Sequence, residues 1–250
     1  MTQDISLTPE LVLQAYCRGF FPMAPARQAA QIDWYDPKIR GVLPIAGFHV
    51  PRRLQDTVLH QPYHITCNRD FRGTIVRCAE ARKETWINDE LIDVYTALHC
   101  AGHAHSIEAW DDEGNPAGGV YGIAIGAAFF GESMYSHQTD ASKVALVHLV
   151  AYLWRRGFIL LDAQFPNEHL RQFGLIEIPR NEYHRQLQAA IAQNVSFLER
   201  QSSKSVSGAG VAGAAGVSAV AGLASGADSD ENSWGFADVT LLLQSITQTS

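Results

Sequence analysis

The chain has 250 residues, of which 46% are hydrophobic and 18% charged, and its formal net charge is −7. This composition excludes a disordered chain and predicts a globular protein with one large or two small domains. The four cysteines show no Cys-x-x-Cys spacing, so we expect neither a zinc site nor a disulfide frame. No apolar run reaches membrane-spanning length and the N-terminus lacks a signal-peptide pattern, so we expect a cytoplasmic protein.

The negative total conceals one basic segment. Residues 38–83 contain nine Lys and Arg side chains against three Asp and Glu, a local net charge of +6. Such an excess can form a phosphate-attracting surface on an acidic protein. A solvated surface of mixed charge gives the same count, so charge alone leaves the partner open.

The N-terminal region begins with a helix signal. Thr8 followed by Pro9 predicts the start of a helix, and Gly19 predicts its end. Residues 20–23 and 32–37 are aromatic clusters next to proline, which predict turns packed against an apolar surface. The following segments are predicted as extended pieces over 42–50, a helix opening at Pro51, a strand over 64–68, and helices over 71–82 and 89–101.

A glycine-rich hairpin forms the centre of the predicted sheet. After a strand over 105–110, residues 118–136 are two apolar runs broken at Gly126, which allows the positive φ of a tight turn. In the second run, alternation places four side chains on one face: Phe130, Glu132, Met134 and Ser136. A carboxylate between large apolar groups is costly to ionise unless a hydrogen-bond donor pairs with it, so Glu132 is a candidate functional residue.

A second polar pair ends the next strand. Asp140 and Gly157 bound a predicted helix over 141–156, and residues 158–164 form a strand that places Asp162 and Gln164 on one face. An acid and an amide at the end of an apolar strand can contact each other and a common ligand. An edge strand whose polar end meets solvent explains the same pattern. Shorter helices are predicted over 167–173 and 180–192.

The element order predicts the fold class. From residue 105 onward it is strand, strand, strand, helix, strand, helix, which gives an α+β sheet with antiparallel hairpins and one helical crossover. Acetyltransferases have this layout, although a layout does not identify chemistry. Residues 202–227 have the composition of a linker, and residues 234–246 regain apolar content, so docking of that last piece stays open.

Seven motifs resemble the signature of the leucyl/phenylalanyl-tRNA–protein transferase family. They occur in order within residues 19–185: GFFP (19–22), WYDP (34–37), TWI (85–87), GHAHSIE (102–108), GESM (131–134), ASK (141–143) and DAQ (162–164). The resemblance implies an enzyme that moves Leu or Phe, less often Met, from aminoacyl-tRNA to the α-amino group of an N-terminal Arg or Lys, which creates a bacterial N-degron.

The resemblance also implies a domain plan. It gives a smaller α+β N-terminal domain over residues 1–62, contributing to tRNA and aminoacyl-adenosine binding, and an acetyltransferase-like (GNAT-like) catalytic domain over 63–200. Residues 201–250 are expected to be a flexible tail of low complexity.

The implied reaction is the aminolysis of an ester, which needs a route for one proton and stabilisation of a tetrahedral oxyanion. In the resemblance, Asp162 orients Gln164, which relays the proton. A neutral amide is a poor base, so the division of roles between the two stays open. Glu132 matches the family carboxylate that holds the aminoacyl-adenosine end or the amino group of the donor.

The resemblance also supplies binding residues. Trp34 and Trp86 match the adenosine-stacking and entrance tryptophans, a contact worth about 1–3 kcal/mol per base. The donor side chain is expected at Phe129, Met134, Leu149, Leu153 and Leu161, with Ser136 also at the substrate; for Leu149 and Leu153 an ordinary core position is the alternative. The tRNA phosphates are expected at Lys38, Arg40, Arg52 and Arg53.

No cofactor and no metal is expected, because His103-x-His105 lacks a clear third ligand. Two other functions fit the layout. An acyl-CoA-dependent N-acyltransferase would need a glycine-rich pyrophosphate loop before the crossover helix, and residues 138–142 contain no glycine. A non-catalytic RNA-binding module would keep the basic surface without the chemistry, and the retained Glu132, Asp162 and Gln164 count against it.

Overall fold

The computed structural model describes residues 7–198 and 239–244. The helices are α1 (Pro9–Cys17), α2 (Arg52–His60), α3 (Phe71–Glu80), α4 (Asp89–Cys100), α5 (Ala141–Arg156), α6 (Glu168–Arg171) and α7 (Arg180–Ile191). The strands are β1 (Phe21–Met23), β2 (Asp33–Tyr35), β3 (Ile39–Leu43), β4 (His64–Cys67), β5 (Ala104–Trp110), β6 (Pro116–Ile125), β7 (Ala128–Ser136), β8 (Leu160–Gln164) and β9 (Ile176–Pro179).

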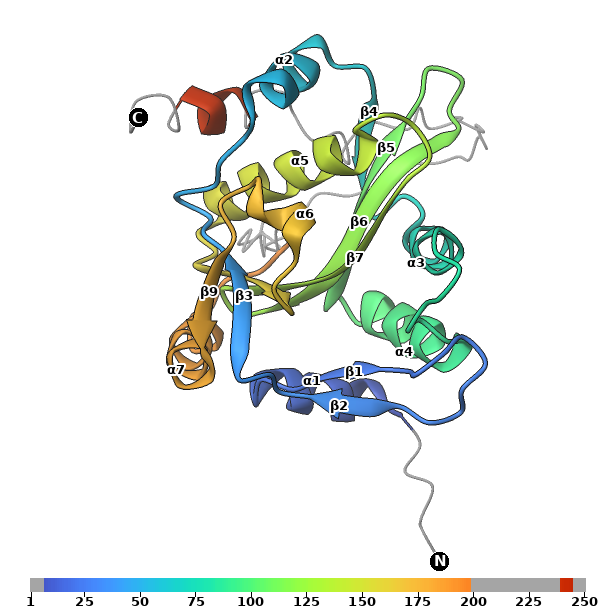
Figure 1. Cartoon of the computed structure of the whole chain (residues 1–250), viewed down its shortest axis with the longest axis vertical. Helices are drawn as coiled ribbons and strands as arrows, with labels where there is room; N and C mark the ends of the chain where they lie inside the picture. The colour runs from blue at the N-terminus through green and yellow to red at the C-terminus, as the bar shows by residue number, and fades with distance from the viewer. Residues whose placement is uncertain (1–6, 199–238, 245–250) are drawn as a thin grey trace, which may run out of the picture.

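A seven-stranded sheet organises the molecule, in the order β4-β5-β6-β7-β8-β3-β9 (Figure 1). Its neighbouring strands are antiparallel except β7 and β8, which are parallel and joined by the crossover helix α5. These two strands pair only from Ala128↔Leu160 to Phe130↔Asp162. The α+β prediction is therefore confirmed, and the short parallel pairing leaves the far ends of β7 and β8 free to separate.

Two hydrophobic cores lie on the two faces of the sheet. The α5-side core packs α5 and α2 against the sheet, with Leu54, Phe129 and Leu153 among its buried members. The α4-side core joins α1, α3, α4 and α7 and includes Tyr16 and Phe130. The alternation of Phe129 and Phe130 between the two cores is what a strand buried on both faces requires.

Most of the predicted elements are confirmed. Thr8 caps α1 through its hydroxyl, which accepts from the Leu11 amide at 3.2 Å. Gly126 has φ +55, and a Cβ there would stand 2.7 Å from the Ile191 carbonyl oxygen, so the β6–β7 turn needs glycine. Gly157 ends α5 with φ +79.

Helix α5 begins and ends at the predicted residues, but the side chain of Asp140 does not cap it. The Asp140 carboxylate instead binds Lys143 Nζ at 2.7 Å. Ser136 Oγ accepts from the Ser142 amide at 3.1 Å. A hydroxyl at the end of β7 therefore satisfies one of the free amides of this helix.

The two aromatic clusters predicted as turns are instead short strands. β1 and β2 pair antiparallel, with Pro22 opposite Trp34. Phe21 stacks on Tyr35 and meets Phe165 edge to face. Strands of three residues are too short to show an alternation in the sequence, so the proline signals prevailed in the prediction.

Two observations concern the expected domains. β3, from the segment expected as an N-terminal domain, lies inside the sheet between β8 and β9, so one sheet crosses residue 62. Residues 239–244 are helical, with Val239, Leu242 and Leu243 buried in the α5-side core, and the rest of the expected tail lies outside the described residues. Among the described helices, none is long and apolar enough to cross a membrane.

Candidate active site

A β-bulge lies in β7 at Glu132, beyond the last residue of β7 that pairs with β8. Tyr121 pairs with Ser133 and Gly122 pairs with Gly131, so Glu132 has no residue opposite it on β6. A Cβ on Gly122 would stand 2.2 Å from the Phe130 carbonyl oxygen, so the bulge needs glycine on the facing strand. A bulge bends its strand and re-aims the side chains that follow.

The bulge corrects one prediction. Phe130 lies in the α4-side core, and Glu132 binds tyrosines of that core, but Met134 packs against the α5-side core. The expected common face for Phe130, Glu132, Met134 and Ser136 is therefore wrong beyond Glu132. The extra residue shifts the alternation by one position.

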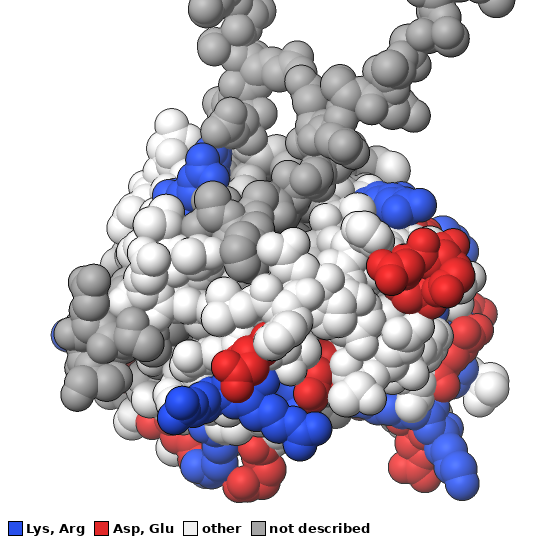
Figure 2. Space-filling view, turned by 90° about the horizontal axis from the view of Figure 1, so that it is seen from above, with Lys and Arg blue, Asp and Glu red and all other residues white. Residues whose placement is uncertain are grey.

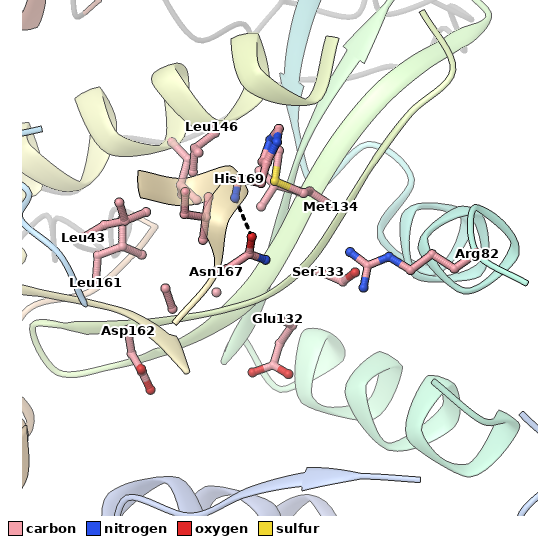
Figure 3. A pocket seen from close by; sticks show the side chains of 15 residues that line it. Leu43, Arg82, Glu132, Ser133, Met134, Leu146, Leu161, Asp162, Asn167 and His169 are labelled. Atoms are coloured by element: carbon pink, nitrogen blue, oxygen red, sulfur yellow. Dashed lines mark hydrogen bonds between the residues drawn. The ribbon is translucent and has the colours of Figure 1, made fainter. Parts of the chain in front are cut away.

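A cavity of about 150 Å³ lies where the two strands separate. Its apolar wall is formed by leucines and a valine from four elements: Leu43, Val120, Leu146, Leu149 and Leu161. The residues Glu132, Asp162, Ser133, Asn167, His169 and Arg82 also line it, and in Figure 3 the carboxylates of Glu132 and Asp162 point away from the leucines. An apolar cavity of this size admits benzene, so the volume suits one phenyl or isobutyl group.

Glu132 is a buried carboxylate held by three donors. Its Oε1 accepts from Tyr16 Oη at 2.6 Å and from Gln164 Nε2 at 2.9 Å, and its Oε2 accepts from Tyr95 Oη at 3.1 Å. Burial raises the pKa of Glu132 to about 7, against the lowering effect of these hydrogen bonds. A carboxylate has about four acceptor positions, so one position on Oε2 remains for a further donor.

Asp162 is fully buried and has all four acceptor positions filled. Arg40 binds it in a bidentate pair, Nε to Oδ1 at 2.9 Å and Nη2 to Oδ2 at 2.7 Å. Tyr183 Oη donates to Oδ2 at 2.8 Å, and the Gln164 amide donates to Oδ1 at 2.8 Å. This carboxylate has no free position for a substrate proton.

Arg40 is the buried cation behind the site, with an exposed fraction of 0%. Its guanidinium stacks between the rings of Phe21 and Tyr183, at 4.6 and 4.2 Å, and also donates to the Gly19 carbonyl. Burial alone would lower the pKa of Arg40, but the facing Asp162 carboxylate raises it above its ordinary value, so the group stays charged. The expectation that Arg40 contacts tRNA phosphates is therefore wrong, because no nucleic acid can reach it.

Gln164 joins the two carboxylates. It adopts a left-handed backbone with φ +63, which is uncommon for a residue with a side chain. Its amide is fixed by Asp162, and this turns its side chain toward Glu132. A continuous hydrogen-bonded chain thus runs from Arg40 through Asp162 and Gln164 to Glu132.

The expected substrate-binding residues divide into two groups. Met134, Leu149 and Leu161 line the cavity together with Glu132 and Asp162. The others do not line it: Phe129 and Leu153 are buried in the α5-side core, Ser136 binds the start of α5, and Trp34 and Trp86 pack half-buried against the α4-side core. For Leu153 the core position considered from the sequence is the one observed.

Several site residues escaped the sequence reasoning. Leu146 lines the cavity one helical turn before Leu149, and this i, i+3 spacing was a usable signal. Tyr16 and Tyr95 come from two different helices and carry no local signal. The position of Arg40 depends on the pairing of β3 with β8, which the local sequence does not reveal.

The remaining basic residues do not form one patch. Arg52 and Arg53 are exposed in the first turn of α2, at the top of Figure 1, whereas Lys38 is exposed before β3 and lies beside the start of α7. Others of residues 38–83 are paired, as Arg72 with Asp93 and Arg77 with Asp70. On the face seen in Figure 2, the basic side chains are interspersed with acidic ones.

Comparison with known proteins places this site in a family context. The model of the leucyl/phenylalanyl-tRNA protein transferase family matches residues 42–188, and the model of the N-terminal domain of that family matches residues 6–38. Together they cover every residue described above as part of the site except Arg40, which lies in the gap between the two matches.

Curated relatives agree with these matches. The chain is 47% identical to the leucyl/phenylalanyl-tRNA–protein transferase of Rhodopseudomonas palustris, over 81% of this chain and 92% of that protein. It is 52% identical to the one from Phenylobacterium zucineum, over 74% and 85%. Among solved structures it is similar to L-PGS from Bacillus licheniformis, with 12% identity, a TM-score of 0.37 and coverage of 65% and 55%, a likeness too weak to inform the fold.

Proposed function

The chain belongs to the leucyl/phenylalanyl-tRNA–protein transferase family and is an aminoacyltransferase that acts on protein N-termini; on that premise we propose that it moves Leu or Phe, less often Met, to N-terminal Arg or Lys in the cytoplasm. The alternatives of an acyl-CoA-dependent enzyme and a non-catalytic RNA-binding module are not favoured by this membership. The observation that carries the proposal is the Glu132–Gln164 pair, joined at 2.9 Å beside an apolar cavity.

The proposed reaction proceeds at the ester carbon of the donor. The α-amino nitrogen of the acceptor attacks this carbon, a C–N bond forms, and the C–O bond to the terminal ribose breaks. One proton leaves the nitrogen and one proton is gained by the departing ribose oxygen. Because the ester is already activated, holding the two substrates in place supplies much of the acceleration.

We assign Glu132 and Gln164 to positioning the reacting groups. The open acceptor position on Glu132 Oε2 takes an N–H of the donor α-amino group. Within the described residues Gln164 Oε1 has no partner, and it accepts a hydrogen bond from the attacking amine. A neutral amide is too weak a base to keep the proton, so the proton passes on to the ribose oxygen.

Asp162 acts through Gln164 rather than on the substrate. Its four acceptor positions are taken by Arg40, Tyr183 and Gln164, so it is a positioning residue that holds the left-handed backbone of Gln164. A direct role as general base would first require it to lose one of these donors. This favours the orienting role over the proton-accepting one.

The donor side chain is assigned to the apolar wall of the cavity, with Met134, Leu149 and Leu161 from the expected set and Leu146 added to it. Trp34 and Trp86 keep their proposed roles at the adenosine and the entrance, and Lys38, Arg52 and Arg53 their role at tRNA phosphates. We also assign residues 1–62 to tRNA and aminoacyl-adenosine binding and residues 63–200 to catalysis. The parallel β7–β8 pair with its crossover helix supports a GNAT-like description of the second part.

A transfer assay tests the function. The purified protein is incubated with Phe-tRNA labelled in the amino acid and with a peptide that begins with Arg. We expect label on the peptide without added coenzyme A, and none on the same peptide acetylated at its N-terminus or beginning with Glu. Equal transfer to the Arg and Glu peptides would contradict the acceptor assignment, and transfer to the acetylated peptide would contradict attack by the α-amino group.

A further inference from the structure

Arg82 stands at the mouth of the cleft and has no function assigned so far. It follows the last turn of α3, and its side chain reaches toward Ser133 with the guanidinium directed at the cleft (Figure 3). It lines the main cavity and also a second, more polar cavity that includes Arg27 and Lys83. Arg82 therefore borders both cavities.

The charge of Arg82 is uncompensated within the described part of the chain. Arg72 and Arg77, on the same helix, bind Asp93 and Asp70 at 3.0 and 2.8 Å, but Arg82 has no such ion pair or hydrogen bond. Of the other cations near this rim, Lys143 is neutralised by Asp140 at 2.7 Å. An exposed guanidinium with free donors beside a cavity is suited to bind an anion in a bidentate way.

On the wall of the main cavity, the groups near Arg82 add donors and no positive charge of their own; the second cavity adds Arg27 and Lys83 together with the carboxylates Glu80 and Glu84. Burial lowers the pKa of His169, and the charges of Lys143 and Arg82 lower it further, so this imidazole stays neutral at pH 7. Asn167 accepts the His169 amide at 2.8 Å through Oδ1, which leaves its Nδ2 as a donor on the cavity wall. Ser133 contributes a hydroxyl to the same wall.

We propose that Arg82 binds the phosphate that precedes the terminal adenosine of the aminoacyl-tRNA. This inference rests on the proposed function. With the aminoacyl group between Glu132 and the apolar wall, the nucleotide must extend outward from the mouth of the cleft, where Arg82 stands. The acceptor carries a positive N-terminal Arg or Lys, which Arg82 repels, so the same residue directs the acceptor to the other side of the cleft.

Three aminoacyl donors that differ in phosphate content test whether Arg82 binds this phosphate. They are aminoacyl-adenosine without phosphate, the same compound extended by one cytidylyl phosphodiester, and full aminoacyl-tRNA. Arg82→Gln should lower kcat/KM about tenfold to a hundredfold for the two donors that contain the phosphate, the range of a charge-assisted hydrogen bond. It should leave kcat/KM for aminoacyl-adenosine within about twofold of the wild type.

Matched variants control the interpretation. Lys83→Gln removes the adjacent exposed charge, which does not line the main cavity, and should leave the preference for the phosphate-bearing donor unchanged. Arg82→Lys keeps the charge without the fork and should fall between the wild type and Arg82→Gln. An equal loss for all three donors, or no loss for the cytidylyl donor, would overturn the inference.

A binding measurement distinguishes this inference from the function on which it rests. A wild-type protein that transfers from none of the donors would contradict the proposed function itself. In that case titration with unacylated cytidylyl-adenosine and with adenosine still decides the role of Arg82. The wild type should bind the dinucleotide more tightly and Arg82→Gln should lose that preference; a preference that persists in Arg82→Gln would refute the phosphate contact.

Discussion

The substitution Glu132→Gln should make the free energy of unfolding less sensitive to a rise in pH than it is in the wild type. The folded structure raises the pKa of this carboxyl from 4.5 to about 7, first through burial. The native state therefore binds more protons than the unfolded chain between these values. Its contribution to the free energy of unfolding falls as the pH rises through this window and stays low above pH 7. A shift of one pKa unit corresponds to about 1.4 kcal/mol, so the loss in the free energy of unfolding across this window is about 3 kcal/mol.

The measurement is urea unfolding of both proteins at pH 5 and pH 8. The change in unfolding free energy from pH 5 to pH 8 should be more unfavourable for the wild type than for Glu132→Gln, by up to about 3 kcal/mol. All other titrating groups contribute equally to both proteins and cancel. Glu84→Gln, which alters an exposed carboxyl, should follow the wild type. The same pH dependence in wild type and Glu132→Gln would refute the reasoning, because it would mean that Glu132 titrates normally.

Three further substitutions test the network, the tRNA surface and the donor pocket. Arg40→Met leaves the buried Asp162 carboxylate without its partner and should lower the free energy of unfolding by about 3–5 kcal/mol, measured in urea; a loss under 1 kcal/mol would show that the Arg40–Asp162 pair does not stabilise the fold. Replacing Arg52 and Arg53 together by Gln should weaken tRNA binding and reduce the slope of log affinity against log salt by about 2, with kcat unchanged; an unchanged slope would remove both from the tRNA contact. Leu149→Ala should lower the free energy of unfolding by about 2–5 kcal/mol. It should also raise the ratio of Phe to Leu transfer in a competition assay, and a constant ratio would place the donor side chain elsewhere.

The hairpin and the crossover helix were predictable from the sequence because their signals are local. The strand periodicity on both sides of Gly126, and the broad apolar side of α5 ended by Gly157, are properties of short windows. Asp162 and Gln164 follow from the same logic, since alternation in one strand places them together. Glu132 follows from the alternation of the second run of the hairpin, and the family motifs agree with it.

The bulge at Glu132 and the burial of Arg40 depend on pairings between distant segments. Gly122 inside an apolar strand was a usable sign of a bulge, but its register with β7 follows only from the folded sheet. Arg40 lies 122 residues from Asp162, and a count of local charges cannot distinguish an arginine inside the sheet from one on the surface. The β1–β2 pair was missed because three residues are too few to show a period.

The most direct test of the account is a crystal structure with a hydrolysis-resistant donor, phenylalanine joined to 3′-amino-adenosine through an amide. We expect the phenyl ring against Leu146 and Leu149, and the α-amino group within about 2.7–3.2 Å of Glu132 Oε2. The adenosine should lie toward the mouth of the cleft. An α-amino group bound away from Glu132, or an adenosine occupying the cavity between β7 and β8, would contradict the account.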